Sequence, residues 1–257
     1  IKTLFECPEI PLSSDLIVLS PGVDINSSFL KNARERGLLI ISEIELASRF
    51  TQTPIIAVTG TNGKSTVTTL IGDILKQAGK KVAVGGNLGT PFITLLEEDP
   101  VDYFVLEVST FQLEGIKTFR PNIAIILNIT PDHLDRHKTF EAYSNLKGAI
   151  SSFQTKEDIL ILNQDDKNVL KQGEHSVAKK YYFSLVEKVS NGVSLENNSI
   201  ITCFDEITKK IFPIEDLKPS MQFQVENLLS AITVTTLLNA TQDEISNAAN
   251  NFKGLGH

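Results

Sequence analysis

The fold is decided by the stretch Ile55-Ile56-Ala57-Val58-Thr59-Gly60-Thr61-Asn62-Gly63-Lys64-Ser65-Thr66. An apolar run predicts a strand over 55–58, and the residues from 64 to 77 predict a helix. Between them, two glycines let backbone N–H groups approach a phosphate without a Cβ in the way. Lys64 supplies a positive charge, and the Ser65 hydroxyl suits Mg²⁺. The stretch therefore predicts a nucleoside triphosphate site between a strand and a helix.

The loop is a variant of the general phosphate-binding pattern. Val58 stands five residues before Gly63, where the general form has glycine. An ordinary strand, turn and helix with a solvated lysine is the alternative, but the strand on one side and the helix on the other favour the nucleotide site. The predicted ATP-binding residues of the loop are Gly60, Thr61, Asn62, Gly63, Lys64, Ser65 and Thr66.

Short apolar runs alternate with amphipathic stretches along the chain, which is typical of βαβ units and a parallel sheet. The expected strands are 16–19, 38–41, 55–58, 81–84, 102–108, 122–128 and 158–162, and the expected helices are 27–36, 43–50, 64–77, 139–153, 221–238 and 243–252. Residues 193–213 alternate in polarity and predict short antiparallel hairpin strands. The fold class is therefore α/β, with a mostly parallel sheet flanked by helices and a small antiparallel hairpin sheet.

The polar stretch Thr51-Gln52-Thr53-Pro54 predicts a linker between two units. The unit before it, residues 1–52, has two expected strands, which bury too little surface for a whole domain, so we expect the remnant of a larger sheet. The unit after it, residues 53–257, holds the nucleotide loop. The chain starts at Ile1 rather than Met, and we expect it to be processed or cut.

Composition argues against several classes of protein. The 257 residues are 41% hydrophobic with a mean hydropathy of +0.01, which suffices for a sizeable core. Acidic residues outnumber basic ones by 31 to 24, and the net charge of −7 argues against a nucleic-acid partner. The longest apolar run, Ile123–Leu127, is far too short to span a membrane. Two cysteines fit a reducing compartment, so we expect a cytoplasmic protein.

Several motifs together resemble one enzyme family. The loop at 60–65, Gly-Thr-Asn-Gly-Lys-Ser, is similar to that of Mur ligases and folylpolyglutamate synthetases. Residues 107–114, Glu-Val-Ser-Thr-Phe-Gln-Leu-Glu, and 128–137, Asn-Ile-Thr-Pro-Asp-His-Leu-Asp-Arg-His, resemble Mur ligase segments, as do 20–23 and 42–45. The resemblance covers essentially the whole chain. It implies a partial Rossmann-like first domain, a central P-loop-type domain that binds ATP, and a C-terminal domain that is absent here.

The resemblance implies an ATP-dependent amide ligase of peptidoglycan precursor synthesis. In the branch of the family that residues 109–113 resemble most, the substrates are UDP-N-acetylmuramoyl-L-alanine and D-glutamate. ATP phosphorylates the carboxylate, and the amine of D-glutamate then displaces phosphate from the acyl phosphate. We expect a monomer with these small-molecule partners and with neither nucleic acid nor a membrane as partner. We also expect that this chain alone binds ATP weakly and does not ligate.

The resemblance implies a catalytic set of Lys64, Glu107, His133 and Lys147, with two Mg²⁺ ions. Glu107 ends a predicted strand at the edge where open α/β sheets bind ligands, and a carboxylate beside Ser65 suits Mg²⁺; a surface glutamate is the alternative. Because Mg²⁺ prefers oxygen, His133 as a ligand of the second ion rests on the resemblance alone. A capped helix start beside His133 is its alternative reading.

Lys147 matches a lysine that the family carries as a carbamate. An ammonium repels Mg²⁺, whereas its CO₂ adduct offers anionic oxygens, so the modification would turn the side chain into a metal ligand. The metal set implied by the resemblance is therefore Ser65, Glu107, His133 and carbamylated Lys147. An ordinary solvated helix lysine remains an equal alternative.

The resemblance also implies substrate contacts by Ser20, Gly22, Asn87, Ser109 and His257. The turn at 86–90, Gly-Asn-Leu-Gly-Thr, is by itself a good turn sequence, so the role of Asn87 has a structural alternative. Asp135, Arg136 and His137 are expected to be structural or surface residues.

The chain departs from the family at two places. Where the family has His-Asn-x-x-Asn, residues 223–227 read Phe-Gln-Val-Glu-Asn, so Asn227 alone is expected to contact adenine. Residues 252–257 end before the arginine of the family motif.

These departures keep a truncated, non-catalytic nucleotide-binding module open as an alternative. Another Mur ligase or a folylpolyglutamate synthetase is a second alternative. Asn62 and Val58 argue against a third, a P-loop switch ATPase or GTPase.

Overall fold

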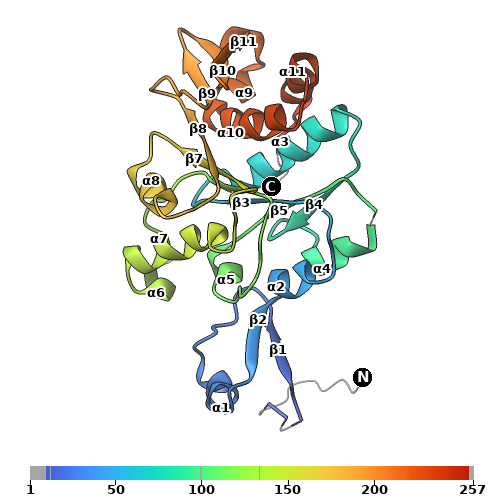
Figure 1. Ribbon diagram of the computed structural model, residues 1–257, viewed down its shortest axis with the longest axis vertical. Helices are drawn as coiled ribbons and strands as arrows, with labels where there is room; N and C mark the ends of the chain where they lie inside the picture. The colour runs from blue at the N-terminus through green and yellow to red at the C-terminus, as the bar shows by residue number, and fades with distance from the viewer. Residues whose placement is uncertain (1–9, 12, 99, 133, 255–257) are drawn as a thin grey trace.

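The computed structural model describes residues 10, 11, 13–98, 100–132 and 134–254, and it is an α/β fold with two sheets. Figure 1 shows the small sheet at the bottom and the large sheet with its helices above it. No helix among the described residues is long and apolar enough to cross a membrane.

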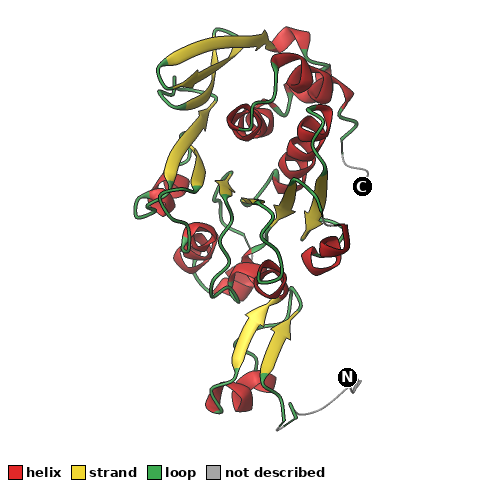
Figure 2. Cartoon of the chain, turned by 45° about the vertical axis from the view of Figure 1, so that its right-hand side comes forward, coloured by secondary structure: helices red, strands yellow, loops and turns green. Residues whose placement is uncertain are grey.

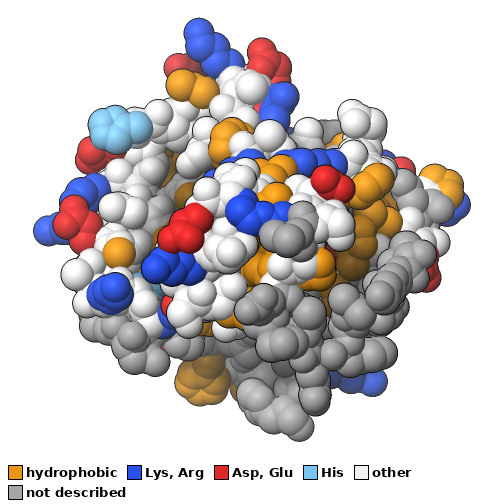
Figure 3. All heavy atoms as spheres, turned by 90° about the horizontal axis from the view of Figure 1, so that it is seen from below, with side chains coloured by type: hydrophobic (Ala, Val, Ile, Leu, Met, Phe, Trp, Pro, Cys, Tyr) orange, Lys and Arg blue, Asp and Glu red, His pale blue; other side chains and the backbone are white. Residues whose placement is uncertain are grey.

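The first unit is a two-stranded parallel sheet with one crossover. Its elements are β1 (Leu16–Leu19), the 3₁₀ turn η1 (Ser28–Leu30), α1 (Lys31–Glu35) and β2 (Leu39–Ser42). Leu30, Ala33 and Ile40 form a small buried cluster, whereas Leu16 and Val18 on one face of β1 are exposed. Figure 3, which looks onto this end, shows hydrophobic side chains among charged ones. Two strands bury little apolar surface, as the sequence predicts.

The second sheet has nine strands in the order β11-β10-β9-β8-β7-β6-β3-β5-β4. They are β3 (Ile55–Thr59), β4 (Val82–Gly86), β5 (Tyr103–Glu107), β6 (Ile123–Ile126), β7 (Ile159–Asn163), β8 (Lys179–Ser184), β9 (Gly192–Glu196), β10 (Ser199–Phe204) and β11 (Ile207–Pro213). The pairs from β4 to β9 are parallel, and β9, β10 and β11 pair antiparallel. The predicted antiparallel strands therefore exist, and they continue the parallel sheet through the β8–β9 pair.

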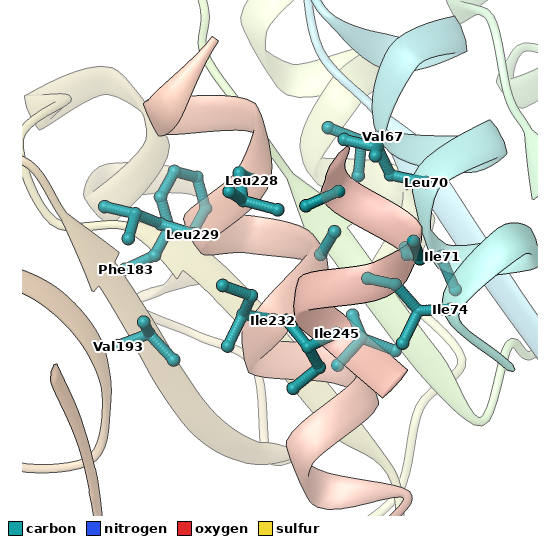
Figure 4. Close-up of a cluster of buried hydrophobic side chains, with 14 of the residues drawn as sticks. Val67, Leu70, Ile71, Ile74, Phe183, Val193, Leu228, Leu229, Ile232 and Ile245 are labelled. Carbon is teal, nitrogen blue, oxygen red and sulfur yellow. The ribbon is translucent and has the colours of Figure 1, made fainter. Parts of the chain in front are cut away.

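Helices cover both faces of this sheet (Figure 2). On one face lie α3 (Lys64–Gln77), α10 (Val225–Leu237) and α11 (Gln242–Asn251), whose apolar side chains meet in Figure 4. The opposite face is covered by α2 (Glu43–Ser48), α4 (Phe92–Leu95), α5 (Thr110–Leu113), α7 (Phe140–Gly148) and α8 (Lys167–Gly173). Ile56 and Val58 pack on the α3 side, and Ile55 and Ala57 pack on the other side. Burial on both faces explains why β3 is apolar without interruption.

Two predicted helices differ from the observed ones. The stretch 139–153 forms α7, and its last turn is the 3₁₀ helix η3 (Ala149–Ser151). The stretch 221–238 breaks at Phe223 and Gln224, between α9 (Pro219–Gln222) and α10. The other short elements are η2 (Leu96–Glu98), α6 (Leu134–His137) and η4 (Ile214–Asp216). The α3 helix spans the predicted 64–77.

A buried carboxylate fastens α2 to the second unit. Ile44 and Ala47 of α2 belong to the apolar cluster beneath the large sheet. Glu45 Oε2 accepts hydrogen bonds from the backbone N–H groups of Lys117, Thr118 and Phe119 at 2.8–2.9 Å. Its Oε1 accepts from the Thr118 hydroxyl at 2.6 Å and from the Arg49 guanidinium at 2.7 Å. The residues just before the predicted linker are therefore anchored to the unit that follows it.

The ionisation of Glu45 links the stability of this junction to pH. Burial disfavours the charged carboxylate, but the hydrogen bonds of Lys117, Thr118 and Arg49 outweigh it and lower the pKa to about 2. A lowered folded-state pKa stabilises the protein fully above the unfolded value near 4.5, and the contribution is lost as the pH falls toward 2.

We predict that Glu45→Gln lowers the free energy of unfolding at pH 7 by about 3 kcal/mol, and that its difference from wild type shrinks as the pH falls from about 4.5. Urea unfolding at pH 7 and pH 3 measures both effects. Glu35→Gln is the control, because Glu35 is an exposed carboxylate in a surface pair with Lys31. An equal pH dependence in wild type and Glu45→Gln would contradict the prediction.

Candidate active site

The predicted phosphate loop joins the carboxyl end of the central strand β3 to α3 and packs closely against its neighbours. Gly63 has a φ of +82°, and a Cβ there would overlap the Asn227 amide at the start of α10. A Cβ at Gly60 would lie 2.9 Å from Leu127 Cβ. Gly60 is therefore required by close approach, whereas Gly63 is required by its backbone conformation, and any side chain there would also displace the Asn227 amide.

Asn128 holds the loop from the end of β6. Its Oδ1 accepts from the Asn62 N–H at 2.8 Å, and its Nδ2 donates to the Asn62 carbonyl at 3.1 Å. The Thr61 N–H donates to the Asn128 carbonyl at 2.9 Å. A reciprocal amide contact of this kind holds the backbone of the loop in one conformation. The sequence motif contains Asn128, but its role in holding the loop was not predicted.

Glu107 is buried where β5 ends, with only 3% of its surface exposed, so the alternative of a surface glutamate is wrong. Its Oε2 accepts from the Ser65 hydroxyl at 2.5 Å, and its Oε1 accepts from the Asn87 amide at 2.8 Å. The backbone closes over it as well: the Asn87 N–H donates to the Glu107 carbonyl at 2.9 Å, and a Cβ at Gly86 would collide with that carbonyl. Residues from three separate elements thus meet at one carboxylate.

Oxygen donors at this position fit Mg²⁺. The ion takes one or two protein oxygens and completes its octahedron with water and phosphate, so a hydroxyl and a carboxylate beside a phosphate loop suffice. Among the described residues there is no group of three or more His, Cys, Asp or Glu side chains that could hold a metal ion by themselves. Ser65 and Glu107 therefore fit an ion that arrives with a nucleotide.

Lys147 reaches the loop from α7 and is 2% exposed, so the alternative of a solvated helix lysine is wrong. Its ammonium donates to the Gly60 carbonyl at 2.7 Å and lies 4.6 Å from the centre of the Tyr143 ring. Burial and the positive charge of Lys64 lower the pKa of Lys147 to about 7, against the opposing effect of Asp132. Burial also lowers the pKa of Lys64, whose ammonium donates to the Thr61 carbonyl at 2.9 Å. The amines of Lys64 and Lys147 therefore lie close together in a poorly solvated part of the site.

A pocket of about 120 Å³ opens between these groups. Its lining brings together the start of α3, the turn after β4, α5 with its N-cap, the segment after β6, and α7: Lys64, Asn87, Ser109, Thr110, Phe111, Asp132, Tyr143 and Lys147. Larger hollows of about 300–340 Å³ lie elsewhere on the described surface, so we place the site by the convergence of charged and polar groups and not by size.

The lining contains residues that the sequence analysis did not assign. Tyr143 lies one helical turn before Lys147, and its hydroxyl lies 3.1 Å from the Thr61 hydroxyl; the four-residue spacing was the available signal. The negative charge of Asp132 acts on both Lys64 and Lys147 and raises the pKa of each, against the effect of burial. Phe111 lies within the segment 107–114 but was given no role.

Other predicted site residues have different surroundings. Ser20 and Gly22 follow β1 in the first unit and are not among the residues that line the pocket. Ser109 lines it, and its hydroxyl also caps α5 in a reciprocal contact with Gln112. Asn227 touches the loop at Gly63. His133 and His257 lie outside the described residues.

The glycine-rich loop after a central parallel strand, with a hydroxyl and a buried carboxylate at its end, defines a P-loop-type nucleotide-binding domain. Residues 58–235 match the family described as Mur ligase middle domain, and the chain belongs to the Mur ligase family. The family predicted from the motifs is therefore confirmed.

Two relatives show how much of a longer protein this chain matches. It is 43% identical over 244 residues to the UDP-N-acetylmuramoylalanine--D-glutamate ligase of Caldanaerobacter subterraneus subsp. tengcongensis, covering 95% of this chain and 53% of that protein. It is also 43% identical over 253 residues to the protein of the same name from Alkaliphilus oremlandii, covering 98% and 56%. The chain thus spans about half the length of these relatives.

Solved structures share the fold. The UDP-N-acetylmuramate:L-alanyl-gamma-D-glutamyl-meso-diaminopimelate ligase from Neisseria meningitides matches with a TM-score of 0.66 and 16% identity, covering 95% of this chain and 80% of that one. A pseudomurein peptide ligase type C from Methanothermus fervidus matches with a TM-score of 0.63 and 22% identity, covering 94% and 58%. At these identities the likeness concerns the fold.

The contact between Gly63 and Asn227 can be isolated with a second glycine. Gly79 has a similar φ of +74°, but nothing lies within 4 Å of a Cβ there. We predict that Gly79→Ala costs about 1 kcal/mol of stability, and that Gly63→Ala costs about 1–3 kcal/mol more because of the collision. Urea unfolding measures both. ATP titration should show at least about tenfold weaker binding for Gly63→Ala alone; equal effects of the two variants would contradict the close approach.

Proposed function

We propose that the whole protein is an ATP-dependent amide ligase that joins D-glutamate to UDP-N-acetylmuramoyl-L-alanine in peptidoglycan precursor synthesis. The observation that carries the proposal is the convergence of Lys64, Lys147 and the Ser65–Glu107 pair at the end of the phosphate loop. Relatives that are 43% identical carry the name of this ligase, which supports the choice of substrates. The enzyme would act as a monomer in the cytoplasm.

The chemistry explains why cations dominate the site. A carboxylate is a poor electrophile, and both it and the γ-phosphate of ATP are anionic, so the site must bring two anions together. The carboxylate oxygen attacks the γ-phosphorus and ADP leaves. The amine of D-glutamate then attacks the acyl carbon, the bond to phosphate breaks, and the amine proton passes to solvent. The Lys64 ammonium and the loop N–H groups stabilise the transferring phosphoryl group, and no protein nucleophile is needed.

We assign Mg²⁺ to the oxygen of Ser65 and the carboxylate of Glu107. When bound, the ion supplies charge neutralisation between the phosphates and the carboxylate. Asn87 orients Glu107 by holding its second oxygen, in the way that outer hydrogen bonds orient metal ligands. A second ion would be held by His133 and by the carbamate of Lys147. The ATP-binding residues proposed for the loop extend from Gly60 to Thr66, with Asn227 near the adenine.

The environment of Lys147 favours the carbamate. A pKa of about 7 leaves about half of the amine neutral at neutral pH, and only the neutral amine attacks CO₂. The new N–C bond forms with release of a proton, and the product carries an anionic carboxylate. That anion would relieve the repulsion between Lys147 and Lys64.

The first unit would supply part of the sugar-nucleotide site through Ser20 and Gly22, with Asn87, Ser109 and His257 contributing from the second unit. Because α2 packs into the second unit through Ile44, Ala47 and Glu45, we propose that the seam between the units lies near Ser42 and not at the linker 51–54.

A ligation assay on the complete gene product tests the proposal. We expect ADP, phosphate and the D-glutamyl product in equal amounts, and repeated turnover of ATP to ADP only when both UDP-N-acetylmuramoyl-L-alanine and D-glutamate are present. The 257-residue chain alone is expected to bind ATP weakly and to form no product. Turnover with a folate or with another amino acid would instead assign another member of the superfamily. ATP binding without ligation by the complete product would assign a nucleotide-binding module.

Glu107→Gln is the matched inactive variant in this assay. Glutamine can keep both hydrogen bonds, because the Ser65 hydroxyl can accept as well as donate, so the fold should be unchanged while the negative charge is lost. Ligation should fall by about 100-fold or more. Glu187→Gln, at an exposed glutamate of the loop after β8, should leave the rate unchanged.

Carbamylation of Lys147 is tested by ¹³C NMR of protein equilibrated with ¹³C-bicarbonate. We predict a carbamate carbonyl signal that grows as the pH rises from 6 to 8, because the neutral amine fraction rises through a pKa of about 7. The signal should be lost in Lys147→Met and kept in Lys76→Met, which alters an exposed lysine. A signal from the α-amino group would persist in every variant. Identical spectra of wild type and Lys147→Met would contradict the modification.

A further inference from the structure

Arg136 joins the two units of the chain. It lies on α6, and its side chain is 18% exposed. Its Nη2 donates to Glu114 Oε2 at 2.8 Å, and its Nη1 lies 3.2 Å from Asp24 Oδ2. Glu114 directly follows α5 in the second unit, whereas Asp24 belongs to the loop that follows β1 in the first unit. One guanidinium therefore holds carboxylates from both units.

The same guanidinium also contacts the wall of the pocket. Its central carbon lies 5.4 Å from the centre of the Phe111 ring, and Phe111 lines the 120 Å³ pocket. His137 packs against the same ring with centroids 5.5 Å apart, and its Nε2 lies 3.0 Å from the Thr110 hydroxyl. Two consecutive residues of α6 thus contact Thr110 and Phe111 of α5, both of which line the pocket.

The Asp24 loop is the part of the first unit that carries the proposed substrate contacts Ser20 and Gly22. Asp24 shapes this loop through its Oδ1, which accepts from the Asn26 N–H at 2.7 Å, and uses its other oxygen for Arg136. The Glu45 contacts fasten α2 to the second unit but do not involve this loop. The Asp24–Arg136 pair therefore controls a different part of the junction.

We propose that Arg136 is a positioning residue that sets the loop 20–26 against α5, so that a sugar nucleotide bound across both units meets the pocket in register. The proposal rests on the function proposed above. Glu114 is 13% exposed and Asp24 is 43% exposed, so the Arg136–Glu114 pair is the stronger of the two ion pairs. The more exposed Arg136–Asp24 pair is weaker and allows the loop 20–26 to adjust. Loss of the Arg136–Asp24 pair should weaken binding of the sugar nucleotide without altering the phosphate loop.

Asp24→Asn tests the Arg136–Asp24 pair in the complete gene product, with Asp15→Asn as the control at an exposed carboxylate of the same unit. We expect the KM and the calorimetric Kd for UDP-N-acetylmuramoyl-L-alanine to rise about three- to tenfold in Asp24→Asn. The KM for ATP, the kcat and the Tm should stay within error of the control. Arg136→Gln should have a larger effect, and adding Asp24→Asn to it should change little more, because the two residues share one interaction.

Two results would overturn the proposal. One is unchanged sugar-nucleotide affinity in Asp24→Asn and Arg136→Gln. The other is an equal loss of ATP affinity, kcat and Tm, which a merely structural role would give. The calorimetric Kd does not require turnover, so a wild type that binds the sugar nucleotide without ligating would refute the proposed function and still decide the role of Arg136.

Discussion

The hydrogen bond from the buried Lys147 ammonium to the Gly60 carbonyl is the contact on which the site depends. It holds α7 against the phosphate loop, and it places the buried amine of Lys147 close to Lys64, which lowers the pKa of Lys147. Tyr143, one turn earlier on the same helix, then reaches the Thr61 hydroxyl. The loop is thus held by hydrogen bonds from α7 on one side and from Asn128 on the other.

Glu45, Lys147 and Glu107 are buried ionisable side chains that are compensated in different ways. Glu45 accepts hydrogen bonds from backbone, hydroxyl and guanidinium donors, and its pKa is lowered to about 2, as expected for a carboxylate that serves stability. Lys147 has one carbonyl acceptor and an aromatic ring, and burial and a neighbouring cation lower its pKa to about 7. A buried cation with so little compensation costs stability, which is typical of groups kept for chemistry. Glu107 has both carboxylate oxygens hydrogen-bonded, to Ser65 and to Asn87, and lies beside the phosphate loop.

The junction between the units repeats this division of roles. The Glu45 contacts are numerous and the Glu45 side chain is fully buried, so they hold α2 firmly in the second unit. The Asp24–Arg136 pair is partly exposed, so solvent screens it and the loop it controls is held less tightly. In the proposed function, the Glu45 contacts would fix the position of α2, while the Asp24–Arg136 pair would let the loop 20–26 adjust to the sugar nucleotide.

The sequence by itself determined the elements whose signals are local. The apolar run and glycines of 55–66 predicted strand, loop and helix, and the period of the apolar positions predicted α3 over 64–77, because backbone conformation and side-chain period are set by near neighbours. Motif resemblance identified the family and named Glu107 and Lys147. It left open whether either side chain was exposed, since burial depends on what packs over a residue.

Only the tertiary structure decided which distant residues meet. The Asn87 contact with Glu107 joins positions twenty residues apart, and Lys147 reaches Gly60 across 87 residues. Neither separation leaves a periodic trace in the sequence. The polar stretch 51–54 suggested a boundary, but the hydrogen bonds of Glu45 to residues 117–119 bind the preceding helix to the following unit. Local composition reports flexibility of the backbone, whereas the junction is fixed by long-range hydrogen bonds that form only when the chain is folded.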